Sequence, residues 1–247
     1  MGILALAAAF LVTALLYASV GFGGGSTYSA LLVLSGFDYR LLPVLSLICN
    51  IAVVTGSSIR FARAGVTPWR GALLLTAIAA PAAMLGGLTP IAEGTFFLLL
   101  GGSLVLAGLA LLIPQGEGQG GAARFARLMP FAAAPLGFLS GLVGIGGGIF
   151  LAPLLHLTRW NEARSIAATA SIFILVNSLF GLAGQLLKNG PDRLGEAAAF
   201  GLPLLVAVVI GGQIGSLLAL KFLDPKYIRW ITAALTIWVG SRLLIGV

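Results

Sequence analysis

The chain has 247 residues, of which 59% are apolar and only 9% are charged, with a mean hydropathy of +1.09 and a formal net charge of +7. A soluble domain carries about a quarter charged residues, so this composition excludes a soluble protein and predicts an all-α protein that crosses a membrane several times. The cations lie in short connectors, where membrane topology and anionic lipid require them, and no polar domain exists to present a basic face to nucleic acid.

Eight apolar segments follow one another along the chain. Each has roughly the 18 residues that a helix needs to cross about 30 Å of hydrocarbon. In chain order they are Ile3–Val20, Leu41–Ile59, Gly71–Ala92, Gly94–Pro114, Leu128–Leu155, Ser165–Leu187, Ala197–Leu220 and Tyr227–Ile245. The first segment lacks a basic flank and has a counterpart inside the chain, so we expect mature structure there rather than a cleaved signal peptide.

An internal repeat divides the chain into two halves. Gly21–Gly25 (GFGGG) matches Gly144–Gly148 (GIGGG) at a spacing of 123 residues, about half of the chain. Each run follows an uncharged helix and precedes a short apolar stretch, a polar connector and three further apolar segments. We therefore predict a first transmembrane repeat over 1–114, a linker over 115–124 and a second transmembrane repeat over 125–247.

The connector cations favour an inverted arrangement of these pseudo-symmetric repeats. The basic cluster of the first half lies between its second and third segments, whereas the densest cluster of the second half lies between its third and fourth. The positive-inside rule produces this exchange when two halves have opposite orientations. Lys188 and Arg193 reduce the contrast, so a parallel arrangement of four plus four segments stays open. Inversion needs an odd number of crossings per half, which a broken segment over Ile3–Gly36 can supply.

The glycine runs predict discontinuous helices. Three adjacent glycines cost a helix about 1 kcal/mol each relative to alanine, and unwound backbone at membrane depth is tolerated only inside protein or beside a cavity. The half-helix after each break begins with unpaired N–H groups and the positive end of its dipole, so two such ends meeting near the membrane centre would bind an anion. The predicted backbone ligands are Gly23, Gly24, Gly25, Gly146, Gly147 and Gly148, and Ser26 and Thr27 are expected to cap the first half-helix and to donate hydroxyls.

Further polar side chains lie inside the apolar runs. Asn50 and Asn177 occupy the segment after each broken one, either as substrate ligands or as contacts between helices. Ser171 is a candidate ligand on the same helix as Asn177. For Ser46, Thr169 and Ser171 alike, however, a hydrogen bond to the local backbone is the commoner arrangement.

Two protonatable residues near segment ends, His156 and Glu93, are candidates for proton coupling. The single cysteine, Cys49, is expected to be a small core residue, and neither a metal site nor a cofactor is expected. Three glycine pairs are expected to serve helix packing: Gly86-Gly87, Gly101-Gly102 and Gly211-Gly212.

The two glycine runs, with their flanks, resemble the signature of the TauE/SafE family of sulfite and organosulfonate exporters. The resemblance rests on Val20–Gly25 (VGFGGG) and on Gly141–Gly148 (GLVGIGGG) followed by Pro153. Thr169–Ser171 is similar to the small hydroxyl-bearing stretch that follows in the family, whereas Ala30 of the first half stands where Pro153 would align. The resemblance covers the whole chain and implies export of a small anion across a bacterial plasma (inner) membrane.

These features together predict a secondary transporter that exports a small anion, such as sulfite, an organosulfonate or a related oxyanion or carboxylate. The proton gradient or the membrane potential would drive it, because Gly23–Thr27 lacks the lysine of a P-loop. An anion channel of the same architecture is the alternative. An intramembrane enzyme is not expected, because Ser140 and His156 lie on one broken segment and the spacing of a rhomboid protease is absent. The expected partners are the anion and membrane lipid, with a homo-oligomer left open.

Overall fold

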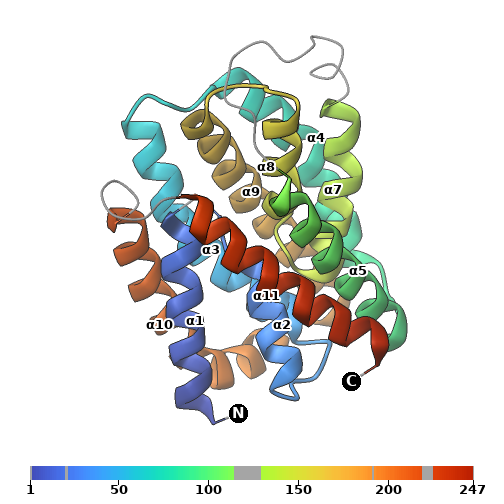
Figure 1. Cartoon of the computed structure of the whole chain (residues 1–247). Helices are drawn as coiled ribbons and strands as arrows, with labels where there is room; N and C mark the ends of the chain where they lie inside the picture. Colours follow the sequence, from blue (N-terminus) through green and yellow to red (C-terminus); the bar gives the residue numbers. More distant parts are fainter. Residues whose placement is uncertain (1, 20–21, 114–128, 191, 219–224, 247) are drawn as a thin grey trace.

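The computed structural model of the chain describes residues 2–19, 22–113, 129–190, 192–218 and 225–246 (Figure 1). These residues form ten helices and no strand, which confirms the all-helical prediction. In chain order the helices are α1 (Ile3–Ser19), α2 (Gly25–Leu34), α3 (Leu42–Arg63), α4 (Trp69–Leu88), α5 (Glu93–Leu112), α7 (Met129–Val143), α8 (Gly148–Leu157), α9 (Ala163–Asn189), α10 (Asp192–Leu218) and α11 (Pro225–Ile245).

Four of these helices, α3, α4, α5 and α9, are long and apolar enough to cross a membrane. The other apolar helical stretches of the described chain have 10–17 residues. The predicted segment Leu128–Leu155 is divided between α7 and α8, because the second glycine run interrupts the helix. The predicted linker, 115–124, lies outside the described residues.

The local sequence explains where several helices begin and end. α3 has Pro43 in its first turn, where a missing N–H costs nothing, and Arg60 and Arg63 in its last turn, where cations stabilise the negative end of the dipole. α9 ends at Asn189, and the residue that follows, Gly190, has a φ of 86°, which favours glycine.

The main helix contacts join one half of the chain to the other. α1 lies along α10 and α7 lies along α4, so the first helix of each half packs against the fourth helix of the other. The third helices, α3 and α9, pack against each other, as do the last helices, α5 and α11. In Figure 1 α1 rises from the N-terminus at the bottom, whereas α7 descends from the top, so the two run in opposite directions.

Glycines allow close approach of the backbones in the α1–α10 and α4–α7 pairs. A Cβ built on Gly137 or Gly141 of α7 would overlap backbone atoms of α4, and one built on Gly211 or Gly215 of α10 would overlap backbone atoms of α1. These pairs are four residues apart, which places both members on one face of a helix. Dispersion contacts between backbones therefore replace the side-chain packing of a soluble core at these crossings.

The packing role predicted for the glycine pairs is confirmed with one exception. Gly86 and Gly87 meet backbone atoms of α7 and α9, and a Cβ built on Gly101 would lie 3.0 Å from the carbonyl oxygen of Gly240. A Cβ on Gly102 would have no atom within 4 Å, so this residue faces away from the neighbouring helices. Cys49 is buried, as expected of a small core residue.

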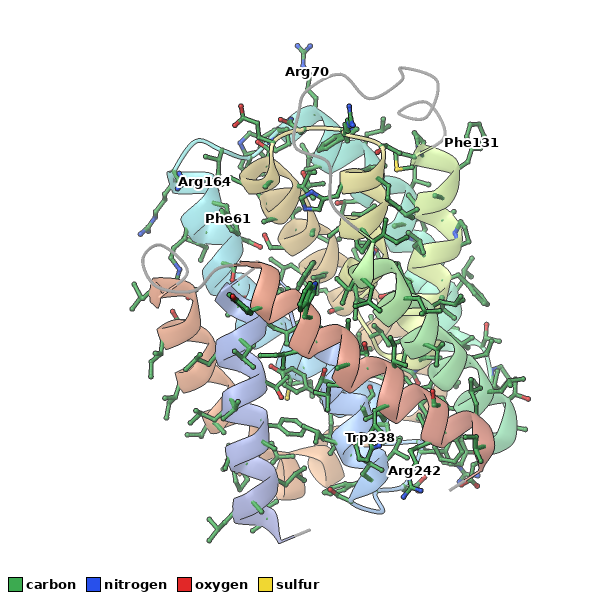
Figure 2. All side chains as sticks on the ribbon, viewed as in Figure 1. Phe61, Arg70, Phe131, Arg164, Trp238 and Arg242 are labelled. Carbon is green, nitrogen blue, oxygen red and sulfur yellow. The ribbon has the colours of Figure 1, made fainter. Side chains whose placement is uncertain are left out.

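The connectors gather at two opposite faces of the molecule. On the face that we call the Trp160 face, Ser165 donates a hydrogen bond of 3.0 Å to the carbonyl of Val66, which joins the first turn of α9 to the α3–α4 connector. On the opposite face, the Tyr39 face, the α2–α3 and α4–α5 connectors and the end of α9 line a common pocket. Both chain termini lie at the Tyr39 end in Figure 1, and Figure 2 shows Arg70 and Arg164 at the Trp160 end.

Candidate functional site

Both glycine runs interrupt a helix, as the sequence predicts. α1 ends at Ser19 and α2 begins at Gly25, while α7 ends at Val143 and α8 begins at Gly148. The residues that precede the two half-helices, Gly24 (φ 87°) and Gly147 (φ 76°), have left-handed backbones. A side chain in this conformation costs about 1–2 kcal/mol, so only glycine fits without strain.

The two breaks meet at the side chain of Asn50, which α3 places between them. The Asn50 amide nitrogen donates a 3.1 Å hydrogen bond to the carbonyl of Ile145 in the second break. A Cβ built on Gly146 would lie 2.6 Å from that same nitrogen, and one built on Gly25 would lie 2.7 Å from the Ile145 carbonyl oxygen. A Cβ on Gly23 would overlap the amide oxygen of Asn50. Glycine is therefore needed in both runs so that the two backbones can approach one asparagine.

Several buried polar atoms without a hydrogen-bond partner belong to the helices that surround this meeting point. Among the residues that the structure describes they include both amide atoms of Asn177, the hydroxyl of Ser178 on α9, and the hydroxyls of Ser140 and Tyr28. The amide oxygen of Asn50 belongs to the same set. Each such group costs about 1–3 kcal/mol when it is left unpaired inside a protein.

Three of these groups lie directly against the breaks. A Cβ on Gly146 would lie 3.3 Å from the Ser178 hydroxyl oxygen, and one on Gly24 would lie 2.8 Å from the Tyr28 hydroxyl oxygen. The Cβ atom of Ser140 would lie 3.3 Å from a Cβ on Gly147. Sequence reasoning missed Tyr28 and Ser178 because neither residue belongs to the repeated glycine pattern. For Ser178 the sequence does contain an indication, because a hydroxyl residue directly follows Asn177 inside an apolar run.

The predicted capping role of Ser26 and Thr27 is wrong. The residue before α2 is Gly24, no side chain caps this helix, and both hydroxyl residues lie within its first turn. The Thr27 hydroxyl instead lies 2.6 Å from the hydroxyl of Tyr17 and so joins α2 to α1. Ser26 is buried beside it. Gly24 occupies the capping position because the chain turns there through a left-handed backbone conformation, which glycine adopts without strain.

The expectation of local bonding holds on α9 and fails on α3. Thr169 donates to the carbonyl of Ser165 at 2.8 Å, and Ser171 donates to that of Ala168 at 2.9 Å. Ser46 donates instead to the carbonyl of Gly25 at 2.7 Å, which joins the start of α2 to α3. Ser171 therefore uses its hydrogen within α9, about 9 Å along the helix from Asn177.

The two candidates for proton coupling lie away from the breaks. His156 is in the last turn of α8, eight residues beyond Gly148, which is about 12 Å along a helix. Glu93 is the exposed first residue of α5 and lines a pocket with the end of the chain at the Tyr39 face. The structure does not bring either residue to Asn50.

Two broken helices that meet inside an apolar helical protein define an integral membrane protein with discontinuous helices. Residues 5–243 match the family model described as sulfite exporter TauE/SafE, and the chain belongs to this family. It is therefore a membrane transporter protein.

The relatives agree with this assignment. The chain is 32% identical over 245 residues to a probable membrane transporter protein of Sinorhizobium fredii, with 97% of each chain covered. It is 37% identical over 102 residues to sulfite exporter TauE/SafE family protein 1 of Arabidopsis thaliana, which covers 41% of this chain and 21% of that protein. A probable membrane transporter protein of Methanocaldococcus jannaschii is 28% identical over 124 residues, 48% of this chain and 46% of the relative. No solved structure matches the chain.

Proposed function

We propose that the chain exports a small anion, such as sulfite, an organosulfonate or a related oxyanion, which it binds where the two glycine breaks meet. The observation that carries this proposal is the convergence of both breaks on Asn50 among unpaired buried polar groups. The first N–H groups of α2 and α8 have no carbonyl one turn earlier, and each helix directs the positive end of its dipole toward its break. Neutral donors of this kind suit an anion with several oxygen atoms.

The side chains around the breaks complete such a site. The Asn177 amide and the hydroxyls of Ser178, Ser140 and Tyr28 can each donate one or more hydrogen bonds to an oxyanion. Asn50 would position the breaks relative to each other through its bond to Ile145. Gly23–Gly25 and Gly146–Gly148 would contribute backbone N–H groups, as the sequence suggests.

The two repeats, 1–114 and 125–247, are inverted in this proposal. The opposite directions of α1 and α7 and the exchanged pairs α1–α10 and α7–α4 support it. Each broken helix then approaches the centre from its own face, and rocking of one repeat against the other would expose the site to each side in turn.

The distribution of cations supports one orientation of the chain in a bacterial plasma membrane. Among the cations whose side chains the structure describes, five lie at the end of α3, in the connectors of the Trp160 face or at the helix starts that follow them, whereas three lie near the Tyr39 face. The first group is Arg60, Arg63, Arg70, Arg159 and Arg164; the second is Arg40, Lys188 and Arg242. The positive-inside rule makes the Trp160 face cytoplasmic. Export then runs from the Trp160 face to the Tyr39 face, and both chain termini lie outside the cytoplasm.

A reporter fused to the C-terminus tests this orientation. Alkaline phosphatase at residue 247 should be active, whereas green fluorescent protein at the same place should stay dark. The opposite pair of signals would show that the Tyr39 face is cytoplasmic.

The membrane potential is sufficient to drive export. Moving one charge through 100 mV is worth about 2.3 kcal/mol, and a cell interior at negative potential repels an anion outward. Neither His156 nor Glu93 lies at the breaks, so anion binding there involves no proton on either residue.

Anion flux into liposomes that contain the purified protein tests the binding site. Gly24→Val and Gly147→Val place bulk and a strained backbone in the breaks, so flux of sulfite should be abolished while the protein stays monodisperse. Gly102→Val is the matched control, because a Cβ at that position meets nothing within 4 Å. Normal flux in both break variants would overturn the site.

The substrate and the transport mode are open to the same assay. Sulfite, sulfate, thiosulfate, taurine, sulfoacetate and simple carboxylates form the screen. Flux at channel rates without coupling to a second gradient would replace the transporter by an anion channel of the same architecture.

A further inference from the structure

A pocket of about 270 Å³ opens at the Tyr39 face, between the α2–α3 connector, the start of α5 and the end of α9. Its polar lining comes from Tyr39, Arg40, Gln185, Lys188 and Asn189. Two cations from separate elements thus face one hollow of the size of a small oxyanion with its water.

Lys188 is half-buried at the wall of this pocket. Its ammonium group donates a 3.2 Å hydrogen bond to the carbonyl of Thr89, which is a neutral acceptor. Of the side chains that the structure describes, none offers Lys188 a carboxylate within pairing distance. An ammonium group has three donors, so two of them are free to bind an anion in the pocket.

Arg40 lies at the exposed mouth of the pocket. Its guanidinium group donates to the Tyr39 hydroxyl at 3.3 Å and lies 5.5 Å from the centre of that ring. The Tyr39 hydroxyl raises the pKa of Arg40, and the charges of Asp38 and Glu93 act in the same direction. These carboxylates also weaken the field of Arg40, so Lys188 supplies the larger attraction for an anion.

The floor of the pocket reaches the second glycine break. Leu142 lines the pocket and stands two residues before Gly144, and Pro43, also in the lining, is so close to Gly144 that a Cβ there would overlap it. Gln185 is buried and donates to the carbonyls of Gly141 and Leu142 at 2.9 and 3.3 Å. The pocket therefore connects one membrane face with the backbone that opens the proposed anion site.

A similar cation stands at the opposite face. Arg60 follows Asn50 by ten residues on α3, just as Lys188 follows Asn177 by eleven residues on α9. It donates to the amide oxygen of Gln213 on α10 at 3.0 Å, again a neutral acceptor. Each of the two helices that carry these asparagines thus has a cation in its last turn.

We propose that the pocket of Lys188 and Arg40 is an anion-binding vestibule, in which an oxyanion or sulfonate is held between the second glycine break and the medium. This inference rests on the proposed function, because it assigns a second site to the same anion. Lys188 is the principal ligand, and Arg40 raises the local anion concentration at the mouth.

The test compares sulfite flux from the Tyr39 side for Lys188→Met, Lys188→Arg and the wild type in oriented liposomes. The methionine variant should raise the apparent KM roughly five- to tenfold and reduce its dependence on ionic strength, while the maximal flux changes little. The arginine variant keeps the charge and should retain the wild-type KM. Arg242→Gln is the control, because it removes an exposed cation near the same face that does not line the pocket.

An unchanged KM in a folded Lys188→Met variant would overturn the vestibule. Calorimetric titration of sulfite into the purified protein separates this failure from that of the proposed function. If the wild type binds sulfite but shows no flux, and Lys188→Met no longer binds it, the vestibule is supported and export is overturned. If the wild type, Lys188→Met, Lys188→Arg and Arg242→Gln all transport sulfite with the same KM, export is supported and the vestibule is overturned.

Discussion

Asn177 and Asn50 should respond in opposite ways to replacement by leucine. Asn177 is fully buried, and both of its amide atoms are unpaired in the described part of the chain. Each unpaired atom costs about 1–3 kcal/mol, and leucine has the same branched shape and the same number of side-chain heavy atoms, so Asn177→Leu should leave stability unchanged or raise it by about 1–3 kcal/mol. Asn50→Leu removes the bond to the Ile145 carbonyl and should lower stability by about 1–3 kcal/mol.

Cys49 makes this comparison simple to measure. It is the only cysteine and it is buried, so a thiol-reactive dye reports thermal unfolding directly. Sulfite flux should fall about ten- to a hundredfold in Asn177→Leu, because a hydrogen bond to a charged ligand is worth about 1.5–3 kcal/mol. A lower unfolding temperature for Asn177→Leu, comparable with that of Asn50→Leu, would show that its amide is bonded in the protein. Wild-type flux in that variant would refute its role as a ligand.

Three further substitutions test the framework around the breaks. Gln185→Leu removes the donor to two α7 carbonyls and should lower the free energy of unfolding by about 1–3 kcal/mol, measured with the same dye. Gly137→Ala should lower it by about 1–3 kcal/mol, because its Cβ meets α4 backbone that cannot rotate away, whereas Gly94→Ala has open space and should change it little; equal effects would contradict the packing argument. Thr27→Val removes the hydroxyl contact with Tyr17 and should cost about 1 kcal/mol, and no loss in the melting curve would show that α1 and α2 are held by apolar packing alone.

Much of the fold follows from the sequence because membrane helices obey simple rules. The uncharged runs predict the helices, and the repeated glycines predict both breaks, since three glycines in series are too costly for a continuous helix. Ser46 shows where such reasoning stops. Its hydroxyl reaches the carbonyl of Gly25 on another helix, and sequence spacing cannot reveal a contact between helices.

The same limit applies to the candidate site. The sequence identifies Asn50 because an amide in an apolar run must find a partner, but not that its partner belongs to the other half of the chain. Tyr28 begins the short apolar stretch that follows the first glycine run, and this pattern gives no sign that its hydroxyl lies against Gly24. The residue types of Ser26 and Thr27 favour a capping position, whereas the turn before α2 requires glycine.

The bond between Asn50 and Ile145 has a consequence for the resting protein. Asn177, which occupies the matching helix of the second predicted repeat, makes no equivalent bond among the described residues, so the two predicted repeats differ at this position. If the repeats are inverted, the carrier changes from one access state to the other when each repeat adopts the conformation of the other. This change would break the Asn50–Ile145 bond without forming an equivalent bond at Asn177. A bond worth about 1 kcal/mol shifts a two-state equilibrium about fivefold. Without substrate, the carrier would then populate mainly the conformation in which the site is open to one side of the membrane. The difference between Asn50 and Asn177 would set which side that is.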